Sequence, residues 1–104
     1  MNYKVVITKN AEVDLNRFIE YLLFEKKNRQ AATNLLKDFE ASVEQLKYVA
    51  NSLKFCSNPK LKMLGYRRIQ FLRHRYFMLY RVSDGYVYVD AIFHNLQDYE
   101  NKMY

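Results

Sequence analysis

The second half of the chain combines side-chain types suited to holding and cleaving a phosphodiester. Imidazole transfers protons near neutral pH, guanidinium groups bind phosphate oxygens in pairs, and aromatic rings stack on unpaired bases. Cations also stabilise the negative charge that develops when the 2′-hydroxyl of RNA attacks the neighbouring phosphorus. These side chains predict phosphate binding and are compatible with metal-independent RNA cleavage. They are Arg67, Arg68, Arg73, Arg75, Arg81 and His94.

Other kinds of active site lack the residues they need. The chain has two histidines, His74 and His94, and one cysteine, Cys56, too few for a zinc site or an intrachain disulfide. Two glycines cannot build a phosphate-cradling loop, and no Gly-x-Ser-x-Gly elbow is present. We therefore expect no metal and no cofactor, and we expect Cys56 to be an inert, small hydrophobic side chain.

Length and composition bound the class of protein. The 104 residues predict one domain spanning positions 1–104. No apolar run approaches about 18 residues and no signal-peptide pattern opens the chain, so we expect no membrane span. The single cysteine suits a reducing, cytoplasmic location.

Positive charge is concentrated in one part of the chain. The net charge is +6, from 17 basic and 11 acidic residues. No acidic residue occurs between Gln45 and Ser83, and that interval contains Lys47, Lys54, Lys60, Lys62, Arg67, Arg68, Arg73, Arg75 and Arg81. A basic region of this kind attracts a polyanion such as RNA, or an acidic segment of a protein partner.

Three runs rich in aromatic and β-branched residues predict the strands that carry these cations. They are Tyr66–Leu72, Tyr76–Val82 and Tyr86–Phe93. The short polar connections between them predict an antiparallel meander, with Gly85 allowing a tight turn. Because side chains alternate along a strand, Arg68 and Gln70 share one face, which we expect to point away from the helices.

The first half of the chain predicts a strand followed by two helices. Tyr3–Ile7 resembles a strand, and Asn10 is the predicted N-cap of a helix that ends near Phe24. The second helix carries one apolar stripe of Ala32, Leu35, Leu36, Phe39, Val43, Leu46 and Ala50. We therefore predict an α+β fold with the order β-α-α-β-β-β. A helical hairpin packs on one face of an antiparallel sheet, and the other face is free for function.

In order and spacing, these elements resemble the RelE/ParE superfamily of toxin–antitoxin toxins over nearly the whole chain. The resemblance rests on three motifs, Ala11-x-x-Asp14-Leu15, Gly65-Tyr66-Arg67-Arg68-Ile69 and Tyr76-Phe77-Met78-Leu79-Tyr80-Arg81-Val82. The last motif is followed by a turn, a β-branched strand and a terminal histidine. RelE-like members are mRNA endonucleases that act in the ribosomal A site, whereas ParE-like members poison DNA gyrase.

The resemblance to the nucleases implies specific roles. His94 would transfer a proton, Arg68 and Arg81 would hold the scissile phosphate, and Tyr99 would stack on a base or assist proton transfer. The flanking RNA backbone would be bound by Lys60, Lys62, Arg67, Arg73 and Arg75. RelE-like toxins commonly have an arginine directly after the tyrosine that opens the second meander strand, and this chain has Phe77 there.

The resemblance also implies partners. A cognate antitoxin would wrap the domain, placing acidic groups on the arginines and apolar groups on the exposed aromatic side chains. The resemblance favours a ribosome-associated, metal-independent mRNA endonuclease. A ParE-like inhibitor of DNA gyrase without nuclease activity, and a non-toxic binding module on the same scaffold, are the alternatives.

Overall fold

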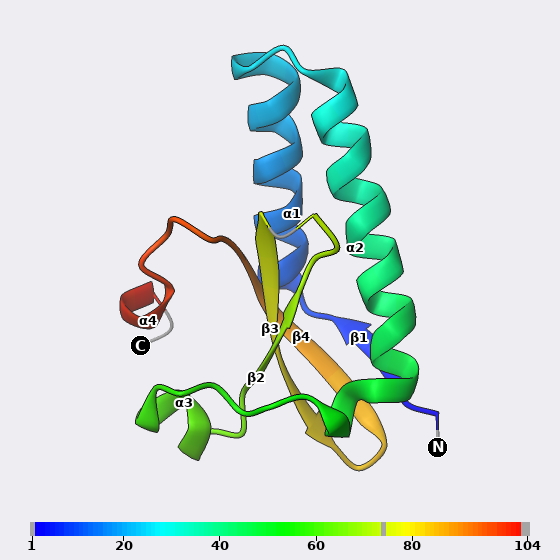
Figure 1. Ribbon diagram of the computed structural model, residues 1–104, viewed down its shortest axis with the longest axis vertical. Coiled ribbons are helices and arrows are strands. Elements are labelled where there is room, and N and C mark those ends of the chain that lie inside the picture. The colour runs from blue at the N-terminus through cyan, green and yellow to red at the C-terminus, as the bar shows by residue number, and fades with distance from the viewer. Residues whose placement is uncertain (1, 74, 103–104) are drawn as a thin grey trace.

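The computed structural model describes residues 2–73 and 75–102, so His74 lies outside the described residues. It contains one four-stranded sheet with a helical hairpin on one side (Figure 1). In chain order the elements are β1 (Lys4–Ile7), α1 (Lys9–Glu20), η1 (Tyr21–Glu25), α2 (Arg29–Val49), η2 (Ala50–Ser52), α3 (Pro59–Met63), β2 (Arg67–Gln70), β3 (Tyr76–Ser83), β4 (Tyr86–His94) and α4 (Tyr99–Lys102). The predicted α+β class and element order are confirmed, with α3 and α4 as additional short helices.

The sheet has the strand order β1-β4-β3-β2. Strands β2, β3 and β4 form the predicted antiparallel meander, whereas β1 pairs with β4 in parallel, so that the complete sheet is mixed. The β3–β4 turn consists of Asp84 and Gly85, whose φ angles are 50° and 80°. A two-residue turn with positive φ angles matches the right-handed twist of the flanking strands. The Asp-Gly sequence favours such angles, and the turn could therefore be predicted from the sequence.

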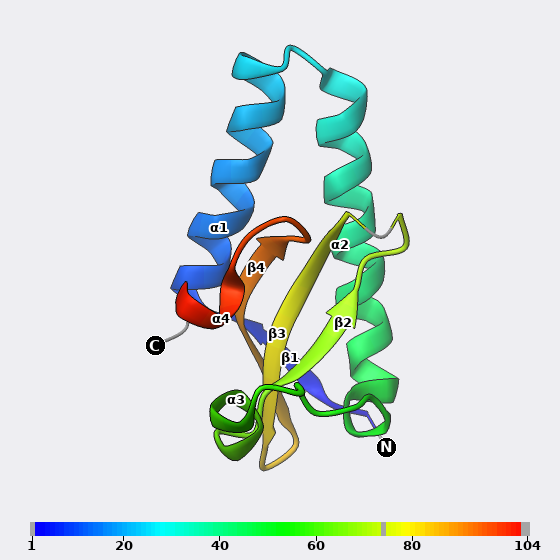
Figure 2. The ribbon, with the colours of Figure 1, turned by 60° about the vertical axis from the view of Figure 1, so that its left-hand side comes forward.

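The helical hairpin begins at Thr8, whose hydroxyl accepts a hydrogen bond from the amide of Ala11. The prediction that Asn10 is the N-cap is therefore wrong, because Asn10 already lies inside α1. The last turn, η1, is a π-helix in which the Lys26 amide donates to the Tyr21 carbonyl. Asn28 then caps α2. Both views show the tip of the hairpin extending past the end of the strands (Figures 1 and 2).

A hydrophobic core fills the space between the hairpin and the sheet. The predicted stripe of α2 contributes Ala32, Leu35, Leu46 and Ala50, whereas Leu36 is exposed. The buried Tyr80 of β3 donates its hydroxyl to the carbonyl of Ala50, at 2.7 Å. This hydrogen bond ties the end of α2 to the centre of the sheet.

The other side of the sheet is only partly open. A second apolar cluster there joins Leu61 of α3 and the buried Cys56 to Phe77, Leu79, Ala91 and Phe93 of the sheet, with Tyr66 and Tyr99 packed against it. The expectation that this face is entirely free is therefore wrong.

Within residues 2–73 and 75–102, no helix is long and apolar enough to cross a membrane.

Candidate functional site

His94 lies on the helix side of the sheet. It pairs in register with Tyr76, and the two rings meet edge to face at 5.0 Å. Tyr76 in turn meets the ring of Phe18 on α1 at 5.1 Å. The His94 Nδ1 atom accepts a hydrogen bond from the amide of Leu96, at 3.1 Å. This bond and the ring contact with Tyr76 orient the imidazole.

A cleft of about 1090 Å³ opens between the hairpin and the ends of β3 and β4. We call it the helix-side cleft. Its walls combine aromatic rings with basic groups, including Arg17, Phe18, Tyr21, Arg75, Tyr76 and His94. Arg17, Lys26 and Arg75 form no ion pair within the described part of the chain, so the cleft carries excess positive charge. It is suited to an anionic ligand with apolar groups.

Arg73 anchors the β2–β3 connection to α2 at the border of this cleft. Its Nη1 atom donates to Oδ1 of Asp38 and, at 3.4 Å, to the carbonyl of Asn34. The Asp38 side chain is only 7% exposed, so the ion pair is shielded from water on the carboxylate side. Asp38 was not among the residues predicted from the sequence to contribute to a site. Its spacing from Leu35 and Ser42, both also buried on α2, was the available signal.

On the outer side of the sheet, Arg68 is held between aromatic rings. Its guanidinium carbon lies 3.7 Å from the centre of the Phe77 ring and 5.7 Å from that of Tyr99. Its Nη2 atom donates to Oε1 of Gln70, at 3.0 Å. The prediction that Arg68 and Gln70 point away from the helices is confirmed. Phe77 is the platform on which Arg68 rests.

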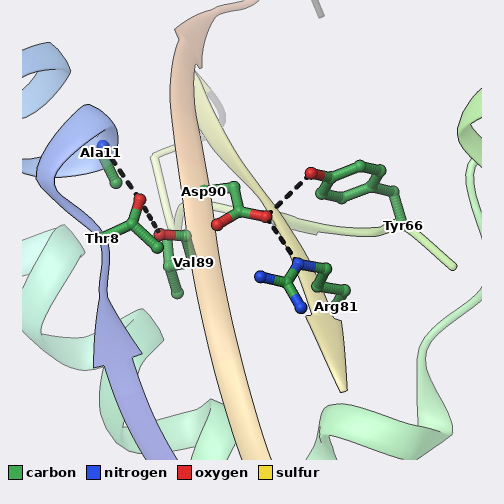
Figure 3. Close-up of polar contacts among 6 residues, drawn as sticks. All are labelled: Thr8, Ala11, Tyr66, Arg81, Val89 and Asp90. Carbon is green, nitrogen blue, oxygen red and sulfur yellow. Dashed lines mark hydrogen bonds and ion pairs between the residues drawn. The ribbon is translucent and has the colours of Figure 1, made fainter. Parts of the chain in front are cut away.

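A β-bulge in β4 brings three polar side chains together on the outer side (Figure 3). We call them the bulge group, and they are Tyr66, Arg81 and Asp90. Leu79 pairs with Ala91 and Tyr80 with Val89, so Asp90 is an additional residue without a partner opposite. Its Oδ2 atom accepts hydrogen bonds from the Tyr66 hydroxyl, at 2.8 Å, and from Arg81 Nε, at 2.9 Å. Bulges commonly re-aim a side chain in this manner.

Contact with Asp90 changes the pKa values of both Tyr66 and Arg81. Burial raises the pKa of the Tyr66 hydroxyl above its ordinary value, and the hydrogen bond to Asp90 raises that pKa further. The hydrogen bond to Asp90 likewise raises the pKa of Arg81. Both partners therefore keep their protons and continue to donate to the Asp90 carboxylate at neutral and moderately alkaline pH.

The four side chains predicted to be catalytic do not meet at one point. Arg68 and Tyr99 contact each other on the outer side, and Arg81 lies on the same side, bound to Asp90. His94 lies on the helix side, because it faces Tyr76 and lines the helix-side cleft. The sheet itself separates the proposed proton donor from the proposed phosphate-binding arginines.

The cations predicted to bind the RNA backbone are also dispersed. Arg67 donates to the carbonyls of Asn51 and Leu53, and it lies 3.9 Å from the centre of the Phe55 ring. Lys60 and Lys62 are exposed on α3, and Arg75 lines the helix-side cleft. Acidic residues from elsewhere in the sequence neutralise further cations of the basic interval, in the pairs Lys47–Glu44, Arg73–Asp38 and Arg81–Asp90. Charge clustering in the sequence does not produce one basic face here.

A helical hairpin on one face of a small mixed sheet, with a basic strand β2 at its edge, is the architecture expected of RelE/ParE toxins. The comparisons with known proteins agree. A family model described as "ParE toxin of type II toxin-antitoxin system, parDE" matches residues 5–99. The chain belongs to this family of ParE toxins.

A solved structure gives the same fold. The chromosomal ParDE toxin–antitoxin system from P. aeruginosa matches with a TM-score of 0.69 and 20% sequence identity, over 88% of this chain and 95% of that chain. At this identity the match bears on the fold alone. No curated protein sequence matches the chain.

Proposed function

We propose that this chain is a type II toxin that inhibits DNA gyrase without cutting RNA, and that a cognate antitoxin neutralises it. The observation that carries the proposal is the position of His94 on the opposite side of the sheet from Arg68 and Arg81. General acid–base catalysis needs the proton donor within hydrogen-bonding reach of the phosphate-binding groups. The placement of these groups on opposite sides of the sheet does not provide that geometry.

Phe77 supports the same conclusion. RelE-like nucleases commonly have an arginine at the corresponding place, whereas this ring is 1% exposed and serves as the support for Arg68. Membership in the ParE family also favours a target other than RNA, because ParE-like toxins of the superfamily act on gyrase.

For the antitoxin, the helix-side cleft is the docking site that we propose. Arg17, Lys26 and Arg75 provide positive charge around its aromatic walls, so an acidic segment with apolar side chains complements it. A disordered antitoxin segment can order on such a surface and lose its flexibility on binding. A small acidic or DNA-binding-type protein in the neighbouring reading frame would be the first candidate antitoxin.

The decisive experiment is expression of the toxin in cells with two parallel measurements. Transcript ends are mapped to detect mRNA cleavage, and gyrase-linked DNA breaks are assayed in the same cultures. We expect DNA breaks and growth arrest without new transcript ends. His94→Ala is expected to leave the arrest unchanged, since His94 has no catalytic role in this proposal.

Two results would overturn the proposal. New transcript ends that disappear with His94→Ala would identify the mRNA endonuclease suggested by the resemblance to RelE-like toxins. Normal growth at high expression of the folded protein, with no cleavage of either nucleic acid, would identify a non-toxic binding module. Circular dichroism of the purified His94→Ala protein controls for misfolding.

A further inference from the structure

One part of the outer side is exposed and combines aromatic and basic side chains. The register of β1 with β4 and of β4 with β3 brings them to one face, beside the β3–β4 turn. Tyr86 is 40% exposed and Val6 is 37% exposed. We call this region the outer hairpin surface, and its members are Lys4, Val6, Arg81, Tyr86 and Tyr88.

The side chains of this surface are fixed in place. The rings of Tyr86 and Tyr88 stack at 6.0 Å, and the guanidinium carbon of Arg81 lies 4.6 Å from the centre of the Tyr88 ring. Asp90 in the bulge binds Arg81 through Nε, so rotation of the guanidinium is restricted (Figure 3). The Tyr66 hydroxyl, which donates to the same carboxylate, also interacts with the Arg81 guanidinium. The Arg81 side chain is nevertheless 41% exposed, so a carboxylate of a partner can reach its outer nitrogens.

The net charge of this region favours a protein partner over a nucleic acid. Lys4 and Arg81 are accompanied by Asp90 and by Asp84 in the turn, so the net charge of the region is close to zero. Binding to a nucleic-acid backbone depends on several uncompensated cations. A protein segment instead needs apolar contact area and a few directed polar groups, and tyrosine and arginine are the residues enriched at such contacts.

We propose that the outer hairpin surface binds the toxin's protein target, through an exposed segment with a carboxylate beside apolar side chains. The carboxylate pairs with the terminal nitrogens of Arg81, and the apolar groups cover Tyr86, Tyr88 and Val6. The assignment to the target rests on the proposed function, in which the antitoxin occupies the helix-side cleft. The two partners then use opposite sides of the sheet.

The test uses Tyr86→Glu, which replaces an exposed ring by a charge that repels the expected carboxylate. Tyr48→Glu is the matched control, because Tyr48 is a 60% exposed tyrosine on α2. Binding to purified DNA gyrase and growth arrest are measured for both proteins and the parent. We expect Tyr86→Glu to weaken gyrase binding by about 30-fold, the size of an interface hot spot. Tyr48→Glu should match the parent, and both variants should keep the parent's melting temperature.

Arg81→Lys sharpens the result, because lysine keeps the charge beside Asp90 but not the forked geometry. We expect a loss of about tenfold in gyrase binding at an unchanged melting temperature. Gyrase binding equal to the parent in both variants would overturn the proposal. So would unchanged gyrase binding combined with a lower affinity for duplex DNA, which would make the surface a DNA contact.

Failure of the proposed function has a different signature. If the parent protein arrests growth but does not bind gyrase, gyrase is not the target, and the growth assay alone decides the role of the surface. Loss of growth arrest in folded Tyr86→Glu, with Tyr48→Glu still toxic, would then support a different protein target at the same surface. Arrest by both variants would reject the surface.

Discussion

The helix-side cleft and the outer hairpin surface both contain an arginine paired with an aspartate, but the two ion pairs have different structural roles. In the cleft, Arg73 reaches a carboxylate buried on α2, so the pair connects two elements. On the outer hairpin surface, Arg81 is bound by a carboxylate from the adjacent strand, so the pair orients the guanidinium within one sheet. The Arg73–Asp38 pair, whose acid is buried, therefore anchors a loop. The Arg81–Asp90 pair, whose acid lies in a bulge, instead orients an exposed cation.

The largest expected effect concerns the apolar support on the outer side. Phe77→Ala removes a ring that is 1% exposed and carries Arg68, and we expect it to lower the free energy of unfolding by about 3–5 kcal/mol. Urea denaturation measures the change. Phe24→Ala at the hairpin tip, where the ring is 71% exposed, should stay within about 0.5 kcal/mol of the parent. A loss below about 1 kcal/mol for Phe77→Ala would show that the outer cluster is not a packed core.

Arg73→Ala tests whether the cleft-side pair is an anchor. The variant leaves the Asp38 carboxylate buried without its cation, which we expect to cost about 3 kcal/mol in the free energy of unfolding. The exposed neighbour Arg75 provides the control, and Arg75→Ala should change stability by less than about 0.5 kcal/mol. Equal stability of the two variants in urea would mean that Arg73 is a surface cation like Arg75.

Alkaline titration separates the buried phenol of the helix side from the exposed tyrosines. Burial raises the pKa of Tyr80 far above its ordinary value of about 10. The folded state therefore holds this proton more tightly than the unfolded chain, and the resulting stability is complete below pH of about 10 and declines above it. We expect the urea concentration at the midpoint of unfolding to decrease as the pH is raised beyond that value. The decrease should be less steep in Tyr80→Phe.

Tyr80→Phe should also be less stable than the parent at neutral pH. The substitution leaves the Ala50 carbonyl without its hydrogen bond, at a cost of about 1–3 kcal/mol. Identical alkaline profiles for the parent and the variant would remove Tyr80 as the source of the decline.

The smallest expected effect is that of Tyr66→Phe, which removes the phenol hydroxyl as a donor to the Asp90 carboxylate while Arg81 remains as a donor. We expect a loss of about 1 kcal/mol in the free energy of unfolding. Thermal unfolding of Tyr66→Phe beside Tyr86→Phe, which alters an exposed ring, measures it. A larger loss than that of Arg73→Ala would reverse the comparison and make the bulge group the principal anchor.

Local signals in the sequence predicted the elements well. The Asp84–Gly85 turn, the meander and the helical hairpin each depend on neighbouring residues, and all three are confirmed. The outward direction of Arg68 followed from simple alternation in β2, a strand without irregularities. Fold class and the identity of the basic strand could therefore be predicted.

The composition of the site could not be predicted, and the bulge is the physical reason. Unbroken alternation along β4 would place His94 on the same face as Tyr86 and Tyr88. The additional residue at Asp90 shifts the alternation by one, so that His94 points toward the helices instead. A β-bulge has no distinctive local pattern here, and the partners of Asp38 and Asp90 are set by tertiary packing. Proximity in the sequence was therefore a poor guide to the site.

The pairing of β1 with β4 has a consequence for the moment at which the toxin becomes active. Val5 pairs with Val87, and the Thr8 hydroxyl donates to the carbonyl of Val89, across a separation of 81 residues for the second contact. Contacts of such long range form late, because the intervening chain must first be present. During synthesis the helical hairpin can fold while β1 still lacks its neighbour. A nascent chain without β4 has neither the outer hairpin surface nor the wall of the helix-side cleft that contains His94. Under the proposed function, the chain can therefore bind its target only after nearly all of it has been made.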